Sequence, residues 1–215
     1  MAFCTSCGKE IDPVSAFCPH CGHQTSLSQG SQAQVAPNVP GTSFSGISTL
    51  IQTNDIVMKK KILSLTEHYD FEDPQGNKLG EGDGNFFQFP AKFRVLDNSG
   101  EVMRVDGKLI SIRRQFNFYD NSGKELGEIK KKLMKLIGQE YWVEQNGNQF
   151  LRVYGNFVEH DYRFEINKQT VAQVHKNWVA MRDTFGVSIN GDVDHRIVIG
   201  SIIVIEHEEV SERNR

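Results

Sequence analysis

The hydrophobic residues between positions 69 and 171 follow one motif that recurs five times along the chain. Each copy is an alternating apolar strand, a turn containing Gly or Asn, and a second short strand; the copies begin at Tyr69, Phe93, Phe116, Tyr141 and Tyr162. Such alternation indicates half-buried strands, and these turns are typical of β-hairpins because Gly and Asn tolerate positive φ. Five hairpins predict about ten antiparallel strands, and a closed or nearly closed barrel removes their exposed edges.

Two segments interrupt the hairpin pattern. Residues 47–55 are apolar at helical or irregular spacing, and we expect them to cover an open end of the barrel. Residues 80–85 are rich in Gly and acidic side chains. They lack both the Lys-Ser/Thr of a phosphate-binding loop and the carboxylate spacing of an EF-hand, so the sequence predicts a mobile hairpin tip.

The segment 192–209 is difficult to assign because its residues 197–205 are apolar on every side. Its β-branched content favours a strand by propensity. An element that is apolar all round must be enclosed by protein, however, and Asp192 or Asp194 is a suitable helix N-cap. From the residues alone, both a strand and a helix threaded through the barrel remain open.

The cysteines lie in two pairs, Cys4-x-x-Cys7 and Cys18-x-x-Cys21. Two such pairs separated by ten residues have the spacing of a structural Zn²⁺ site, in which four thiolates complete a tetrahedral shell. The alternative is a disulfide or redox pair, but the first residues lack the features of a signal peptide and no βαβ pattern surrounds the cysteines. The segment resembles small zinc ribbons, and we expect structural zinc with no position for catalytic water.

Composition limits the remaining possibilities. Residues 24–43 carry no charge and are rich in Ser, Gln, Gly and Pro, which predicts a flexible linker. We therefore divide the chain into a ribbon at 1–25, a linker at 26–45 and a β domain at 46–210. The net charge of −3 provides no general attraction for nucleic acid, and no apolar run approaches the length of a membrane span. We expect a cytoplasmic protein.

The β domain resembles the LURP-one-related proteins of the Tubby C-terminal-like superfamily, which also contains the phospholipid scramblases. The resemblance rests on residues 127–132, 173–189 and 192–206, including Trp178 and Arg182-Asp183. It implies a mainly β fold, a closed antiparallel barrel of about twelve strands around a buried hydrophobic C-terminal helix. In this chain the helix would span about residues 192–207. The resemblance also implies binding rather than catalysis.

Basic clusters are the candidate lipid contacts, because Tubby domains bind phosphoinositide headgroups through basic side chains on one wall of the barrel. An anionic headgroup would pair with such clusters through charge-assisted hydrogen bonds. The alternative, which we favour, is that they are solvated strand residues that discourage edge pairing. The residues are Lys59, Lys60, Lys61, Arg113, Arg114, Lys130, Lys131 and Lys132.

Catalysis is not indicated by any motif in the sequence. The histidines are scattered, and neither a Gly-x-Ser-x-Gly elbow nor a His-Glu-x-x-His motif is present. Asp192, Asp194 and His195 form a dense titratable cluster that suits either a cation or general-acid site or, as we favour, a helix cap.

We therefore predict a non-enzymatic, zinc-binding recognition or scaffold protein whose barrel binds a protein or small ligand. The first alternative is peripheral binding to anionic membranes through the basic clusters. The second is a nucleic-acid-associated ribbon, which we disfavour because residues 1–25 carry one Lys and no Arg.

Overall fold

The protein was analysed as a computed structural model, which describes residues 2–3, 9–11, 48–63, 66–85, 91–110, 113–132, 140–176 and 184–213. Near the N-terminus, β1 (Ala2–Phe3) pairs antiparallel with β2 (Glu10–Ile11). The remaining elements belong to the β domain. They are the 3-10 helix η2 (Leu50–Gln52), β3 (Asp55–Leu63), β4 (Thr66–Glu72), β5 (Lys78–Asn85), β6 (Lys92–Asp97), β7 (Gly100–Ile110), β8 (Arg113–Asp120), β9 (Glu125–Lys132), β10 (Glu140–Gln145), β11 (Asn148–Asn156), β12 (Asp161–Ile166), β13 (Gln169–Lys176), β14 (Thr184–Ile189) and α1 (His195–Arg213).

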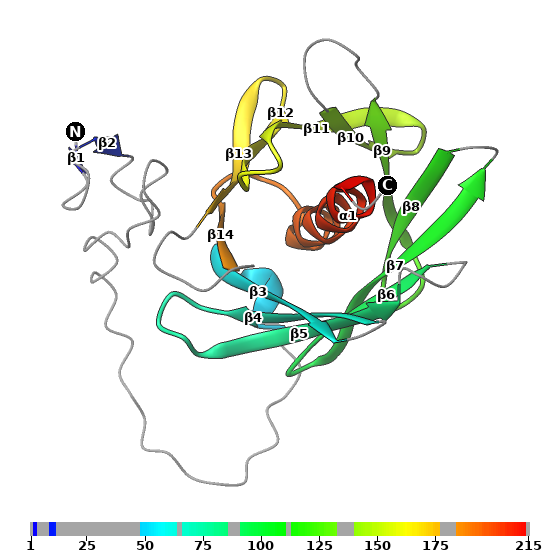
Figure 1. The fold of residues 1–215 in the computed structure, drawn as a ribbon, viewed down its shortest axis with the longest axis horizontal. Coiled ribbons are helices and arrows are strands. Elements are labelled where there is room, and N and C mark those ends of the chain that lie inside the picture. Colours follow the sequence, from blue (N-terminus) through cyan, green and yellow to red (C-terminus); the bar gives the residue numbers. More distant parts are fainter. Residues whose placement is uncertain are drawn as a thin grey trace, which may run out of the picture.

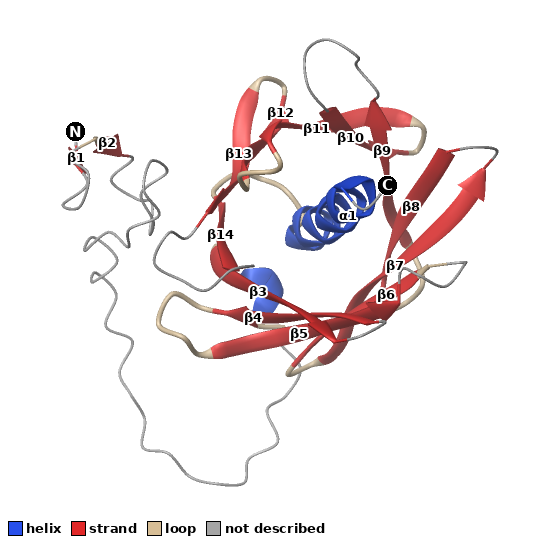
Figure 2. Ribbon diagram, viewed as in Figure 1, coloured by secondary structure: helices blue, strands red, loops and turns tan. Residues whose placement is uncertain are grey.

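Within these described residues, the twelve strands β3 to β14 close into one antiparallel barrel around α1 (Figures 1 and 2). Each strand pairs with its neighbours in the chain, and β14 returns to pair with β3. The predicted fold class, a closed barrel around a buried C-terminal helix, is therefore confirmed.

All five predicted hairpins are present, as β4–β5, β6–β7, β8–β9, β10–β11 and β12–β13. The first four turns place Gly76, Gly100, Gly123 and Gly147 at positive φ. The fifth turn has no glycine and instead holds Asn167 and Lys168 at φ of 51° and 67°. The use of Asn167 and Lys168 in place of glycine explains why the fifth copy of the motif is the least regular in sequence.

The prediction of a mobile tip at residues 80–85 is wrong, because these residues form most of β5. Gly82 faces the barrel interior, where a Cβ atom would lie 2.7 Å from the ring of Phe93. A Cβ atom at Gly84 would meet the same ring at 2.1 Å. The glycines therefore make room for core aromatic rings rather than loosening a turn.

We expect Gly82→Ala to destabilise the barrel by about 1–3 kcal/mol, since the added methyl overlaps the ring of Phe93 and lies in tight contact with that of Phe71. Urea unfolding followed by circular dichroism measures the change. Adding Phe93→Leu should recover part of the loss by removing the clash. A Gly82→Ala protein as stable as the wild type would contradict this prediction, because it would mean that β5 moves away from the Phe93 ring without loss of stability.

Residues 48–53 cover one end of the barrel, as predicted. Leu50 of η2 is fully buried and contributes to the hydrophobic core. The segment is held by Asp97, whose carboxylate accepts hydrogen bonds from the Ser48 hydroxyl and the Leu50 amide. The first residues of α1 begin at this same end, because β14 ends there and residues 190–194 lead directly into the helix.

The central element is a helix. Of the two assignments that the sequence left open, a strand or a helix, the structure therefore supports the helix. Its apolar side chains between Ile197 and Ile205 are at most 1% exposed. A Cβ at Gly200 would lie 2.7 Å from Met103, so this glycine lets β7 approach the helix closely. The helix begins at His195 rather than about 192, and continues to Arg213 rather than about 207.

Candidate functional site

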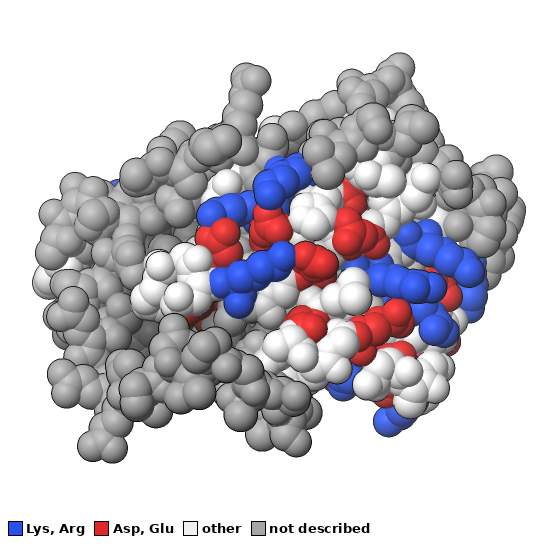
Figure 3. Space-filling view, turned by 90° about the horizontal axis from the view of Figure 1, so that it is seen from below, with Lys and Arg blue, Asp and Glu red and all other residues white. Residues whose placement is uncertain are grey.

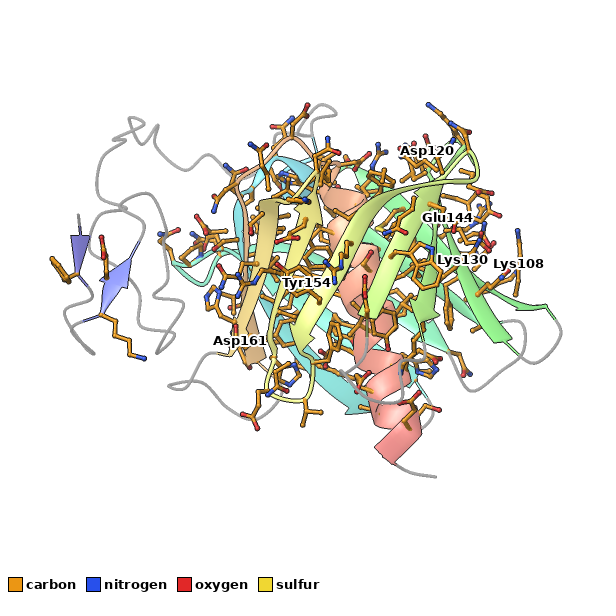
Figure 4. The ribbon with its side chains drawn as sticks, turned by 90° about the horizontal axis from the view of Figure 1, so that it is seen from above. Lys108, Asp120, Lys130, Glu144, Tyr154 and Asp161 are labelled. Atoms are coloured by element: carbon orange, nitrogen blue, oxygen red, sulfur yellow. The ribbon has the colours of Figure 1, made fainter. Side chains whose placement is uncertain are left out.

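The two ends of the barrel differ in chemistry. We call the end that carries the five hairpin turns and the start of α1 the turn end, and the opposite end, where α1 finishes, the exit end. Figure 4 shows Asp120 at the turn end, Asp161 at the exit end and the last turns of α1 extending beyond the strands. Core side chains fill the space between α1 and the wall, and a cavity between α1 and β8–β10 measures only about 10 Å³. That is room for about one water molecule.

Toward the exit end, the buried face of α1 changes from apolar to polar. Glu206, His207 and Glu209 are only 5%, 4% and 5% exposed, although each carries a polar or charged group. Burying such groups is costly unless each finds a partner. In this barrel the partners come from the surrounding strands and from the β11–β12 turn.

One buried cluster joins β3, β4 and α1. The Nζ atom of Lys60 lies 3.4 Å from Oε2 of Glu67, and Nδ1 of His207 lies 3.2 Å from Oε1 of the same carboxylate. The side chains of all three are at most 4% exposed. Burial by itself would raise the pKa of Glu67, but the hydrogen bond with His207 and the charge of Lys60 hold it below its usual value.

Two further contacts surround the same part of the helix. Nδ1 of His160 lies 2.9 Å from Oε1 of Glu206. The hydroxyl of Tyr141 donates to Glu209 at 3.0 Å, and Lys131 lies 3.4 Å from that carboxylate. Burial and the neighbouring Glu209 raise the pKa of Tyr141 far above its usual value, so Tyr141 stays a hydrogen-bond donor.

We name these exit-end residues (Lys60, Glu67, Lys131, Tyr141, His160, Glu206, His207 and Glu209) the polar ring. Because Glu67 and His207 are almost fully enclosed, a substrate has no direct access to them. Sliding α1 by one turn would separate every pair, so the polar ring fixes the register of the helix within the barrel. Buried polar groups are well suited to such a registry role.

Sequence reasoning missed the polar ring, although a signal for it exists. Glu67 precedes Tyr69 and Phe71 at the spacing of inward positions on β4, and Lys60 continues the inward series of Ile56 and Met58. A charged residue in phase with an apolar alternation predicts a buried partner.

The turn end carries an open polar pocket of about 380 Å³. Its lining includes Ser48, Gln52, Ser99, Asn121 and Arg196. The guanidinium of Arg196 is already bound by Asp194, with Nε–Oδ1 and Nη2–Oδ2 distances of 2.9 and 2.6 Å. The pocket therefore has little unpaired charge to attract an ionic ligand.

Within the cluster at residues 192–195, Asp194 has the capping role that we favoured. Oδ1 of Asp194 accepts a hydrogen bond from the backbone amide of Arg196 at 2.9 Å, which caps the first turn of α1. Among the described residues, no group of three or more His, Cys, Asp or Glu side chains is arranged to bind a metal.

The predicted basic clusters separate into outward and inward side chains. Lys59 pairs with Glu72 at 2.5 Å, Lys61 with Asp70, and Lys130 with Glu144 at 2.6 Å. Lys60 and Lys131 belong to the polar ring. Arg113, Arg114 and Lys132 lie in β8 and β9, but their side chains are outside the described part of the structure. Their role in lipid binding stays a prediction.

The zinc ligands Cys4, Cys7, Cys18 and Cys21 lie outside the described residues, as do Trp178, Arg182 and Asp183. The paired strands β1 and β2 flank the first cysteine pair in the sequence. Paired short strands on either side of a Cys-x-x-Cys pair suit a zinc ribbon, and the four zinc ligands stay a prediction.

His175 should make the barrel sensitive to mild acid. Burial lowers its pKa to about 4 from the usual 6.5, because the charged ring loses hydration inside the wall of β13 and β14. Between pH 6.5 and 4 the unfolded chain therefore binds a proton at His175 that the folded chain does not. The contribution of neutral His175 to the free energy of unfolding is fully present above pH 6.5 and is lost as the pH drops toward 4. The expected loss is about 3 kcal/mol.

Urea unfolding at several pH values measures this effect, with His175→Phe as the comparison that keeps a ring against Gly186. The slope of stability against pH between 6.5 and 4 should be smaller in the variant. Identical slopes in the two proteins would contradict the assignment to His175.

Comparison with protein families matches residues 54–206 to the LURP-one-related family and residues 3–25 to a zinc-ribbon domain. A comparison with curated proteins gave no match. A crystal structure of an Arabidopsis thaliana protein is similar with a TM-score of 0.52 and 17% identity, over 72% of this chain and 91% of that chain. At that identity the likeness concerns the fold. Because the family match covers most of the chain, the protein belongs to the LURP-one-related family and carries a zinc-ribbon segment before the barrel.

Proposed function

We propose that the protein is a non-catalytic recognition or scaffold protein whose barrel binds a protein partner on its outer surface. The observation that supports this most directly is the complete burial of the apolar part of α1, since Ile197–Ile205 occupy the space that a ligand would need. The groups of the polar ring contact one another inside the barrel, although Nζ of Lys60 and Oε2 of Glu67 form only a 3.4 Å ion-pair contact without a hydrogen bond. Binding at the surface is therefore the use of this barrel that agrees best with its packing.

Anionic membranes are a second candidate, because Lys59 and Lys61 lie on the outer face of β3 with side chains 40% and 55% exposed. Their pairing with Glu72 and Asp70 offsets the charge that a headgroup would meet. No helix among the described residues is both long and apolar enough to cross a bilayer. Nucleic-acid binding by the ribbon is the least favoured role, given its single lysine.

The test combines vesicles and a purified partner. The full-length protein is floated with neutral and anionic vesicles at low and physiological salt, and a partner crosslinked in cells is purified and titrated calorimetrically. We expect a saturable complex of fixed stoichiometry and no flotation. Salt-sensitive flotation that Lys59→Glu/Lys61→Glu abolishes would replace the proposal with membrane binding. The absence of both a complex and flotation would overturn the proposal.

The ribbon and the barrel are expected to fold as separate modules. Cys18→Ser should remove one zinc ligand, unfold the ribbon and reduce bound zinc, because the metal supplies most of the folding free energy of so small a segment. Calorimetry should show the melting transition of the barrel unchanged. Loss of both transitions together would contradict the two-module division.

A further inference from the structure

Four basic side chains on the outer wall of β6 and β7 differ from the basic clusters singled out in the sequence. They are Lys92, Arg94, Arg104 and Lys108, which we name the β6–β7 patch. The side chain of Arg94 is 67% exposed, more than that of any other ion-paired residue in the described part of the chain, and that of Arg104 is 38% exposed. Lys92 and Lys108 are also exposed. Figure 3 shows basic side chains in two groups with acidic side chains among them, and one group lies toward the right, the side where β6 and β7 lie in Figure 1.

The register of the two strands places like charges together. Arg94 and Arg104 are direct cross-strand partners, and both side chains point outward from the barrel. Like charges directly opposite each other in an antiparallel pair are destabilising. Arg94 also lies directly opposite Asp83 of β5, and Lys92 lies directly opposite Asp106. The Arg94–Arg104 contact is nevertheless a like-charge pair that does not itself stabilise the fold.

The local carboxylates offset this charge only in part. Nε of Arg94 lies 3.6 Å from Glu101, which is too long for a hydrogen bond, and Nε of Arg104 lies 3.4 Å from Asp106. The Arg104 guanidinium also lies over the ring of Tyr119, 5.0 Å from its centroid. Four cations therefore lie beside three carboxylates, those of Glu101, Asp106 and Asp83, and Asp83 is already bound to His68 at 2.6 Å.

We propose that the β6–β7 patch docks an acidic segment of the protein partner. This inference rests on the proposed function and names the surface and chemistry of that partner. Guanidinium groups bind carboxylates bidentately, and Arg beside Tyr is typical of the residues that dominate protein interfaces. A carboxylate between Arg94 and Arg104 removes their repulsion and replaces the weak contacts with Glu101 and Asp106.

The surroundings of the patch favour a narrow protein segment over a broad anionic surface. Glu81 and Asp83 on the adjacent strand β5 have side chains 40% and 57% exposed. A membrane laid flat on this wall would bring anionic headgroups against these carboxylates. A short acidic segment along β6 and β7 would meet only Asp83, which lies opposite Arg94, and would avoid Glu81, which lies opposite Leu96. Complementary charge over such a limited area chiefly sets specificity and association rate.

The test uses the purified full-length protein and a fluorescent glutamate-rich peptide, with anisotropy measured at low and physiological salt. We expect saturable, salt-sensitive binding that Arg94→Glu/Arg104→Glu weakens at least about tenfold. The control Lys124→Glu/Lys168→Glu changes the net charge equally but acts at the turn end, where both side chains are exposed, and should leave affinity unchanged. Arg94→Gln should change Tm little, because the relieved repulsion with Arg104 offsets the lost attraction to Asp83 and Glu101.

Three results would overturn the inference: no binding by the wild type, equal weakening by both double variants, or stronger patch-dependent binding to anionic vesicles than to the peptide. The calorimetric titration of the purified partner separates this inference from the proposed function. If a partner binds the wild type and Arg94→Glu/Arg104→Glu equally well, the β6–β7 patch is not its binding site, and the proposed function is unaffected.

Discussion

Replacement of Ile203 by Asp is expected to abolish the folded barrel. Ile203 is fully buried at the centre of α1, among apolar side chains of the wall. An unpaired carboxylate in that position loses its hydration without gaining a partner, at a cost of several kcal/mol. The lost apolar packing adds to this, and domains of this size are stable by only about 5–15 kcal/mol in total.

Soluble yield and the near-ultraviolet circular dichroism spectrum report the result. Val158→Asp is a matched control, because Val158 is 53% exposed and the same change there should alter stability by no more than about 0.5 kcal/mol. A soluble Ile203→Asp protein with the native spectrum would mean that α1 is not required to fill the barrel.

Glu67→Gln should produce the second large effect, because it removes the negative charge shared by Lys60 and His207 while keeping the shape of the side chain. Removing one partner of a buried ion pair leaves an uncompensated charge, which costs about 3–5 kcal/mol. Lys60 is the residue left uncompensated, with its side chain 4% exposed. Urea unfolding at neutral pH measures the loss.

A control on the same strand separates burial from pairing. Glu72→Gln removes the partner of the 40%-exposed Lys59 and should cost no more than about 1 kcal/mol. Adding Lys60→Met to Glu67→Gln should recover stability, since the buried positive charge then disappears. Equal losses of unfolding free energy from Glu67→Gln and Glu72→Gln would show that the Lys60–Glu67–His207 cluster is solvated.

The hairpins of the barrel could be predicted because their information is local. Alternation from Tyr69 to Val171 and the turn residues Gly76, Gly100, Gly123 and Gly147 determine strand pairs that are neighbours in the chain. The pairing of β3 with β14 is not local, because 120 residues separate the ends of those strands (Leu63 to Thr184 spans β4 to β13). Closure depends on the twist accumulated over all twelve strands.

The glycines at 80–85 and the polar side chains of α1 show where pattern alone is insufficient. A glycine-rich acidic stretch has the composition of a turn, and only the position of the Phe93 ring explains why it is a strand. Glu206 and His207 have the composition of a solvated helix end, and only Glu67 and His160 explain their burial. In both cases the deciding neighbour is distant in sequence.

The sequence by itself determined the spacing of the cysteine pairs, the five hairpins, the uncharged segment between ribbon and barrel and an enclosed apolar element near the C-terminus. Only the tertiary structure decided that β14 closes on β3, that Lys60 and Lys131 point inward while Lys59 and Lys130 pair with carboxylates, and that Arg94 faces Arg104. The physical reason is that periodicity and turn chemistry act between neighbouring residues. The pairing of charges, by contrast, depends on which strands the closed barrel brings side by side.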